Sequence, residues 1–139
     1  MSGAVIFHWD LPVVLQDPRV QKKYFTHWSH TCKAFGVTKL CVVDCDALNP
    51  RFGDAEIDLA VVGSLDEALA LYQNKTPVFV EQGGVPLPLF THPDDPAYVF
   101  GSDYGQLDRS DVEIASDRPL HAHTACGIVL ADWSMNRWR

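Results

Sequence analysis

The sequence lacks long apolar runs, a basic leader and a cysteine framework. No apolar stretch approaches the roughly 18 to 20 residues that a membrane-spanning helix needs, and the N-terminus lacks the basic and apolar regions of a secretory signal. The four cysteines form no C-x-x-C pair and are spaced too irregularly for a secreted disulfide framework: Cys32, Cys41, Cys45 and Cys126. We therefore expect a cytoplasmic protein whose thiols are free and mostly buried.

The motifs of several common enzyme classes are also absent. There is no phosphate-binding P-loop, no G-x-G-x-x-G fingerprint, no G-x-S-x-G elbow and no H-E-x-x-H metal motif. The composition is that of a folded protein, because 47% of the 139 residues are apolar and 21% are charged. A chain of this length buries one sizeable core, so we expect a single domain over residues 1–139.

Positive charge is scarce overall but concentrated in one segment. The net charge of −7 argues against a nucleic-acid partner, since proteins that bind phosphates usually carry an excess of lysine and arginine. However, residues 18–43 contain five basic residues and no acid, whereas residues 94–117 contain seven acids and one arginine. The basic residues are Arg19, Lys22, Lys23, Lys33 and Lys39. Either each run is a solvated face, or a basic helix lies on an acidic body.

Apolar runs and turn residues predict strands that alternate with helices. Buried strands are expected at 4–7, 39–43, 57–62, 77–81 and 98–101, with a sixth at 112–115, whereas 83–88 is too rich in glycine and proline for regular structure. Alternating strands and helices predict an α/β fold with a largely parallel sheet, in which ligands bind beyond the carboxyl ends of the strands.

Residues typical of helix ends predict three helices, over 18–35, from 65 to about 72 and over 121–138. Asp17 can cap the first helix and Gly36 can end it, while Ser64 opens a capping box for the second. The helical spacing of the first predicts an apolar face made of Val20, Tyr24, Trp28, Thr31 and Phe35. Its lysines are expected on the opposite face.

Two places carry residues that could perform chemistry. The loop Phe100–Leu107 leaves a strand through a glycine, where a missing side chain lets a ligand approach the backbone, although the same residues suit an ordinary tight turn. His27 and His30 lie three residues apart on the first helix, and His121 and His123 lie at the head of the last one. Such histidines can bind zinc or remain solvated, and we expect no metal site.

Three stretches follow one another in the order and spacing of a known family: Thr31–Val43, Tyr98–Asp103 with Leu107, and Val112–Ile114 with Leu120–Asp132. They resemble the first motif and next strand, the Gly-Asn/Ser-Glu turn, and the closing segment of the SPOUT superfamily, specifically the SpoU/TrmH-like RNA ribose 2′-O-methyltransferases. The helix expected from Ser64 to Leu71 is similar to the one that this family places between them. The resemblance covers nearly the whole chain.

The resemblance implies a fold, an assembly and a cofactor. The α/β domain would carry a deep trefoil knot at its C-terminal end, form a homodimer and bind S-adenosylmethionine bent among the knot loops. Carried over position by position, the cofactor contacts are Val80, Glu81, Gly101, Ser102, Asp103, Ile114, Leu120 and His121. A flat adenine and a cationic sulfonium suit backbone-lined loops with acids nearby.

The polar positions of the motifs depart from the family. When the Phe-Gly pair of the first motif is aligned, His27 and His30 stand where the family has an asparagine and an arginine. Asp103 replaces the glutamate of the middle motif, and Pro119-Leu120-His121 replaces the family's Ser-Leu-Asn. Either the histidines serve a different acceptor, with His30 as a general base, or catalysis has been lost.

The resemblance therefore implies one of two functions. The first is a methyltransferase that passes a methyl group from S-adenosylmethionine to RNA, at a ribose 2′-hydroxyl, with His30 and His27 as catalytic residues. Its RNA phosphates would be steered by Arg19, Lys22, Lys23 and Lys33. The second is a catalytically inactive SPOUT-fold protein that binds S-adenosylmethionine, RNA or a protein partner.

Overall fold

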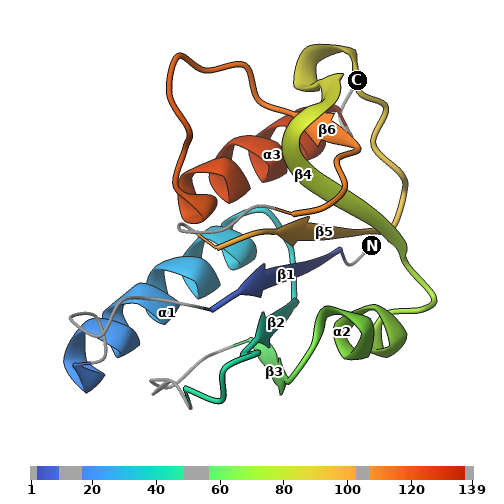
Figure 1. Ribbon diagram of the computed structural model, residues 1–139. Coiled ribbons are helices and arrows are strands. Elements are labelled where there is room, and N and C mark those ends of the chain that lie inside the picture. Colours follow the sequence, from blue (N-terminus) through green and yellow to red (C-terminus); the bar gives the residue numbers. More distant parts are fainter. Residues whose placement is uncertain (1–2, 10–16, 49–56, 103–106, 137–139) are drawn as a thin grey trace.

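The computed structural model describes residues 3–9, 17–48, 57–102 and 107–136, which form a parallel sheet flanked by helices (Figure 1). The strands are β1 (Ala4–His8), β2 (Lys39–Val43), β3 (Asp58–Val62), β4 (Thr76–Pro86), β5 (Pro96–Phe100) and β6 (Val112–Glu113). The helices are α1 (Pro18–Ala34), α2 (Leu65–Leu71), the short 3-10 helix η2 (Leu87–Leu89) and α3 (Ala122–Asn136). The six strands pair in parallel in the order β3-β2-β1-β5-β4-β6, which confirms the predicted α/β class.

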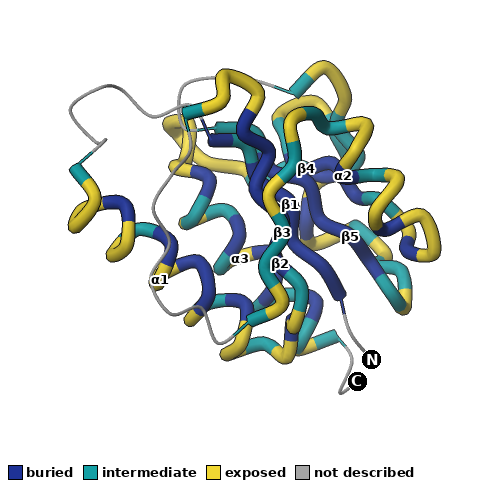
Figure 2. Tube along the Cα trace, turned by 90° about the horizontal axis from the view of Figure 1, so that it is seen from below, coloured by how far each residue is buried: buried dark blue, intermediate teal, exposed yellow. Residues whose placement is uncertain are grey.

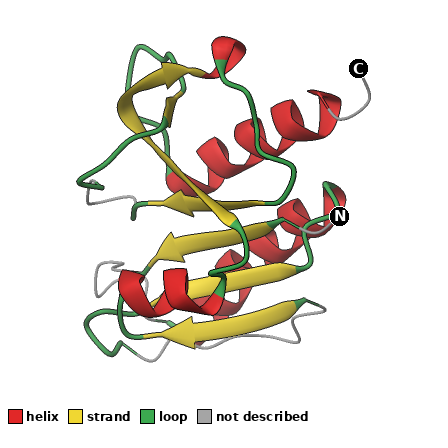
Figure 3. Cartoon of the chain, turned by 90° about the vertical axis from the view of Figure 1, so that its right-hand side faces the viewer, coloured by secondary structure: helices red, strands yellow, loops and turns green. Residues whose placement is uncertain are grey.

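Helices cover both faces of the sheet, with α1 and α3 on one side and α2 on the other (Figures 1 and 3). Side chains of successive strand residues point to opposite faces, so β1 divides between two cores. Val5 and Phe7 belong to the cluster under α1 and α3, whereas Ala4 and Ile6 belong to the cluster under α2. Figure 2 shows the buried positions concentrated in the central strands β1 and β5.

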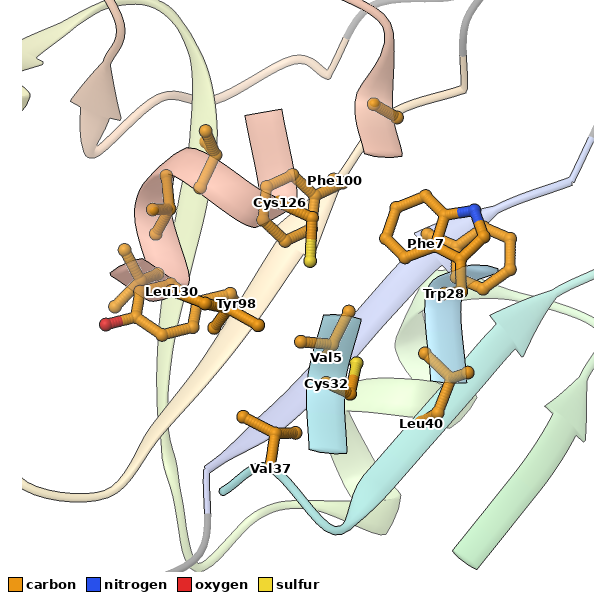
Figure 4. Packing of buried hydrophobic residues seen from close by; sticks show 14 of the residues in the cluster. Val5, Phe7, Trp28, Cys32, Val37, Leu40, Tyr98, Phe100, Cys126 and Leu130 are labelled. Carbon is orange, nitrogen blue, oxygen red and sulfur yellow. The ribbon is translucent and has the colours of Figure 1, made fainter. Parts of the chain in front are cut away.

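The larger core is built around an aromatic stack between β1 and α1. The rings of Phe7 and Trp28 lie parallel with their centroids 4.1 Å apart, and both are fully buried (Figure 4). The expected apolar face of α1 is only partly right, because Val20 is 42% exposed. The buried residues of α1 are Gln21, Phe25, Trp28, Ser29 and Cys32. Relative to the predicted orientation, the helix is rotated about its axis, because Phe25 and Trp28 together face Phe7.

The predicted caps are present, and the cysteines lie as expected. The Asp17 side chain accepts a hydrogen bond from Arg19 N, and the Ser64 hydroxyl accepts one from Glu67 N. All four cysteines are free, and only Cys45 is exposed. Burial raises the pKa of Cys41 to about 12, as expected for a thiol that serves only as core. Within the described ranges, no helix has the length and apolar character that crossing a membrane requires.

The prediction that residues 83–88 lack regular structure is wrong, because β4 continues to Pro86. Its second half pairs with β6 through an irregular register between Val80 and Val85. The pairing is held by Val85 N, which donates to Asp111 O at 3.1 Å, and by Asp111 N, which donates to Phe79 O at 2.8 Å. The Asp111 carboxylate also accepts a hydrogen bond from Phe79 N. Long-range partners therefore hold a glycine-rich segment as strand despite its low intrinsic preference.

Gly84 is the position in β4 where a side chain is least tolerable. A Cβ atom there would lie 2.6 Å from Val112 N and 2.7 Å from the carbonyl carbon of Asp111, both of them backbone atoms. We expect Gly84→Ala to lower the free energy of unfolding by about 2 to 3 kcal/mol, because β6 has to move away from β4. Gly63→Ala is the matched control, since its Cβ would meet only the flexible Glu67 carboxylate at 3.9 Å. Equal denaturant midpoints for the two variants would contradict this account of β4.

Candidate functional site

The pairing of β4 with β5 ends at the level where β5 reaches its carboxyl end. Val80 pairs with Phe100, so Glu81 and Gly101 come next at the same level on the two neighbouring strands. Val80 is buried, whereas Glu81, Gly101 and Ser102 are half-buried. The structure therefore brings together four of the predicted cofactor contacts at the place where parallel sheets usually bind ligands.

The segment that follows β5 crosses over β4 and is tied to Glu81. One carboxylate oxygen of Glu81 accepts a hydrogen bond from Leu107 N at 3.2 Å, and the Ser110 hydroxyl donates to the Glu81 carbonyl. Ile114 follows β6 and packs, half-buried, against the core under α1 and α3. Glu81 thus links β4, just beyond its pairing with β5, to the chain that leads away from Gly101.

The remaining predicted cofactor contacts lie in two loops. Asp103 falls outside the described residues. Leu120 is 38% exposed at the end of the loop that joins β6 to α3 in Figure 1, and the exposed His121 accepts the first helical hydrogen bond, from Ala125 N, through its carbonyl. The start of α3 lies near the end of β5, because Trp28 contacts both Phe100 and His123, at 6.0 and 5.4 Å between ring centroids.

Histidines of α1 and α3 meet beside this edge. The rings of His27 and His123 stack with their centroids 6.1 Å apart, and Nε2 of His123 lies 2.8 Å from the Thr31 hydroxyl and 3.2 Å from the carbonyl of His27. His27 of the first predicted pair and His123 of the second are therefore neighbours within a single chain. His30 is exposed. In the described part of the chain, no three histidine, cysteine or acidic residues form a group that could hold a metal ion.

Comparison with solved structures identifies the architecture. The A. aeolicus TrmH/SpoU tRNA modifying enzyme superposes with a TM-score of 0.70 at 14% identity, covering 99% of this chain and 77% of its own. The SpoU methyltransferase AviRb from Streptomyces viridochromogenes, in complex with AdoMet, gives 0.71 at 15% identity over 99% of this chain. The chain has the SPOUT fold of the SpoU/TrmH group. The fold predicted from the sequence is thereby confirmed.

The likeness to this group is one of fold. An AdoMet-bound rRNA methyltransferase from Sinorhizobium meliloti superposes with a TM-score of 0.67 at 13% identity, covering 99% of this chain. The chain spans 61% of the length of the AviRb structure and 57% of the Sinorhizobium one. No protein-family profile matches the sequence, and no curated protein sequence does. The trefoil knot and the homodimer remain predictions for this SPOUT domain.

The four basic residues assigned to RNA lie on the outer face of α1. Arg19, Lys22, Lys23 and Lys33 are all exposed. Arg19 contacts the Asp17 carboxylate at 3.4 Å, and the hydrogen bond from its backbone N–H holds the pKa of Asp17 below the usual range. Lys39 differs from these four, because it forms an ion pair with Asp58 at 3.3 Å. The face of α1 away from the sheet is therefore the basic surface that the sequence predicted.

A buried imidazole near the other end of β5 was not predicted from the sequence. The side chain of His92 is 3% exposed and lies between the Tyr98 hydroxyl, 2.6 Å from Nδ1, and the Asp132 carboxylate, 2.7 Å from Nε2. Burial and the nearby Asp132 charge raise the pKa of Tyr98 well above its usual value. These bonds fasten the segment before β5 to α3, beside a cleft of about 590 Å³ that Leu89, Phe90 and Trp133 help to line. No spacing in the sequence could have joined positions 40 residues apart.

The sequence analysis also missed His8, since the predicted first strand ended at Phe7. His8 is the last residue of β1 and pairs with Val43 of β2. Its Nδ1 lies 2.9 Å from the carbonyl of Phe100, the residue just before Gly101. Extending the predicted strand by one residue would have placed this histidine at the edge of the sheet.

Proposed function

We propose that this SPOUT domain transfers a methyl group from S-adenosylmethionine to RNA, at a ribose 2′-hydroxyl. The observation that carries the proposal is the likeness over 99% of the chain to methyltransferase structures, two of which hold AdoMet. An RNA 2′-O ribose methyltransferase also superposes, with a TM-score of 0.72 at 13% identity. In the reaction a carbon–sulfur bond breaks, a carbon–oxygen bond forms, and the hydroxyl proton passes to a base.

The residues at the carboxyl edge suit this cofactor. Gly101, the residue after β5, adds no side chain that would keep a ligand from the backbone. Glu81, at the same level on the neighbouring strand β4, supplies a half-buried carboxylate. Val80 and Ile114 add apolar surface. When bound, the cofactor supplies an electrophilic methyl group on a sulfonium cation. Ser102, Asp103, Leu120 and His121 would complete the contacts.

His30 is proposed as the general base. It is exposed on α1 at the position where the family has an arginine, and a neutral imidazole can take a proton near neutral pH. His27 would hold the ribose from the same helix, one turn away. Its stacking on His123 supports this role, because the contact limits the movement of the ring. The cationic arginine and the imidazole differ in charge, which is why loss of catalysis is the second candidate.

The basic face of α1 is proposed to bind RNA phosphates. Lys22→Ala with Lys23→Ala should weaken RNA binding about tenfold and lower the slope of log K against log salt by about 1.5 to 2, because two phosphate contacts are lost. Lys39→Ala is the control, since Lys39 is already paired with Asp58. Fluorescence anisotropy at several salt concentrations measures both quantities. An unchanged slope in the double variant would remove α1 from the RNA interface.

We also propose that two copies of the chain associate, as the resemblance implies. Ile128 and Met135 of α3 are large apolar side chains that are 38% and 59% exposed in the single chain, which supports a partner for this helix. A cytoplasmic location is also proposed, because it is consistent with an RNA substrate. Sedimentation equilibrium tests the assembly, and a monomer at micromolar concentration would refute it.

Two measurements test the function. Calorimetric titration with S-adenosylmethionine shows whether the cofactor binds, and incubation with labelled cofactor and total cellular RNA shows whether methyl is transferred. Alkaline digestion then identifies the acceptor, because a 2′-O-methyl group blocks cleavage of the adjacent phosphodiester and leaves labelled dinucleotides. Binding without transfer would support the inactive SPOUT-fold protein, and a chain that does neither would retain only the fold.

A further inference from the structure

His8 stands in a row with two residues of the proposed cofactor site. Phe7 of β1 pairs with Phe100 of β5, and Phe100 pairs in turn with Val80 of β4. The residues that follow these three are His8, Gly101 and Glu81. They therefore lie side by side at the carboxyl edge, with the glycine between the imidazole and the carboxylate.

Both flanking side chains project toward the α2 face of the sheet. Phe7, Phe100 and Val80 belong to the core under α1 and α3, so the next residue on each strand points the other way. Leu107, which donates to the Glu81 carboxylate, packs against the core under α2 and so agrees with this direction. Since neighbouring strands lie about 4.8 Å apart, the backbones of His8 and Glu81 are separated by about 10 Å, and Gly101 adds no side chain between them.

One hydrogen bond determines the tautomer of His8. The Phe100 carbonyl can only accept, so Nδ1 of His8 carries the hydrogen of the 2.9 Å contact. In the neutral ring, Nε2 is then a hydrogen-bond acceptor. Among the described residues Nε2 has no second partner, and it is not one of the buried polar atoms left unpaired, so solvent reaches it. The ring is thus anchored at one nitrogen and open at the other.

We propose that Nε2 of His8 accepts a hydrogen bond from the adenosyl group of bound S-adenosylmethionine, which makes His8 a further cofactor-binding residue. The inference rests on the proposed function. The adenosyl group offers an amino group and two ribose hydroxyls as donors, and an acceptor beside a glycine gap can reach such a group. Glu81, whose carboxylate is occupied by Leu107 N and Gln82 N, stands on the other side of the gap.

The test is His8→Asn, because an asparagine amide can still donate to the Phe100 carbonyl while the acceptor at Nε2 is lost. Affinities for S-adenosylmethionine and for S-adenosylhomocysteine, which lacks the sulfonium charge, are measured by calorimetry at pH 7.5. We expect the variant to bind both ligands about 5- to 10-fold more weakly, as for loss of one hydrogen bond.

The controls separate this proposal from the function on which it rests. Cys45→Ala, an exposed change at the end of β2, should bind both ligands normally, and equal thermal midpoints exclude misfolding. If His8→Asn binds both ligands like the unaltered chain, or if it loses affinity only for the sulfonium ligand, the role of His8 is overturned while cofactor binding stands. If the unaltered chain binds neither ligand, the proposed function itself is overturned.

Discussion

Replacing His30 with alanine is expected to reduce methyl transfer by about 10²- to 10⁴-fold, the usual contribution of a general base. The cofactor affinity should stay within a few fold, because His30 lies exposed on α1 and is not one of the residues proposed to contact the cofactor. Single-turnover transfer of labelled methyl to RNA measures the first quantity, and calorimetry measures the second. The combination separates a proton acceptor from a residue that only binds the cofactor.

Thr26→Ala provides the matched control for His30. Thr26 is exposed on the same helix one turn earlier, and its hydroxyl donates only to the Lys22 carbonyl, at 2.7 Å. Its removal should leave transfer unchanged. Full turnover in the His30 variant would remove this residue from the mechanism.

Replacing Gly101 with valine is expected to weaken cofactor binding at least 100-fold. Gly101 follows β5 at the centre of the carboxyl edge, where a branched side chain would fill the gap between His8 and Glu81. The obstruction is steric, so Gly101→Ala should give an intermediate loss. Calorimetry measures the affinities, and circular dichroism with thermal unfolding reports whether the sheet is retained.

Gly127→Ala is the control for adding a side chain at a glycine. Its Cβ would meet only the Thr31 methyl group at 3.9 Å, an ordinary contact, within α3. We expect normal cofactor binding in that variant. Unaltered binding in a folded Gly101→Val protein would show that the cofactor lies elsewhere. The proposed cofactor contacts of Gly101 and of its neighbours His8 and Glu81 would then be wrong.

Local patterns in the sequence were enough to predict most elements. The Asp17 and Ser64 caps mark the starts of α1 and α2 because a cap acts over two or three residues. The apolar runs that predict β1, β2 and β5 are continuous because these central strands are buried on both faces. Strands of the parallel sheet were therefore predictable even where their neighbours were not.

The extent of β4 and the rotation of α1 depended on partners outside the segment. Gly83–Pro86 forms strand because the Asp111 carbonyl accepts a hydrogen bond from Val85 N and the Glu113 carboxylate accepts one from Gly83 N. The α1 face is turned toward Phe7 by the stacking of Trp28. Neither contact has a signature within the segment itself, which is why glycine content and helical spacing misled the prediction at these two places.

The sequence by itself determined the positions of the strands apart from the second half of β4, the helix starts and the exposed basic face of α1, because these depend on interactions between residues a few positions apart. Only the tertiary structure decided that His27 stacks on His123 and that His8 bonds to Phe100, a residue 92 positions further along the chain. Such neighbours follow from strand order and helix packing. Those are properties of the folded sheet, and no local periodicity records them.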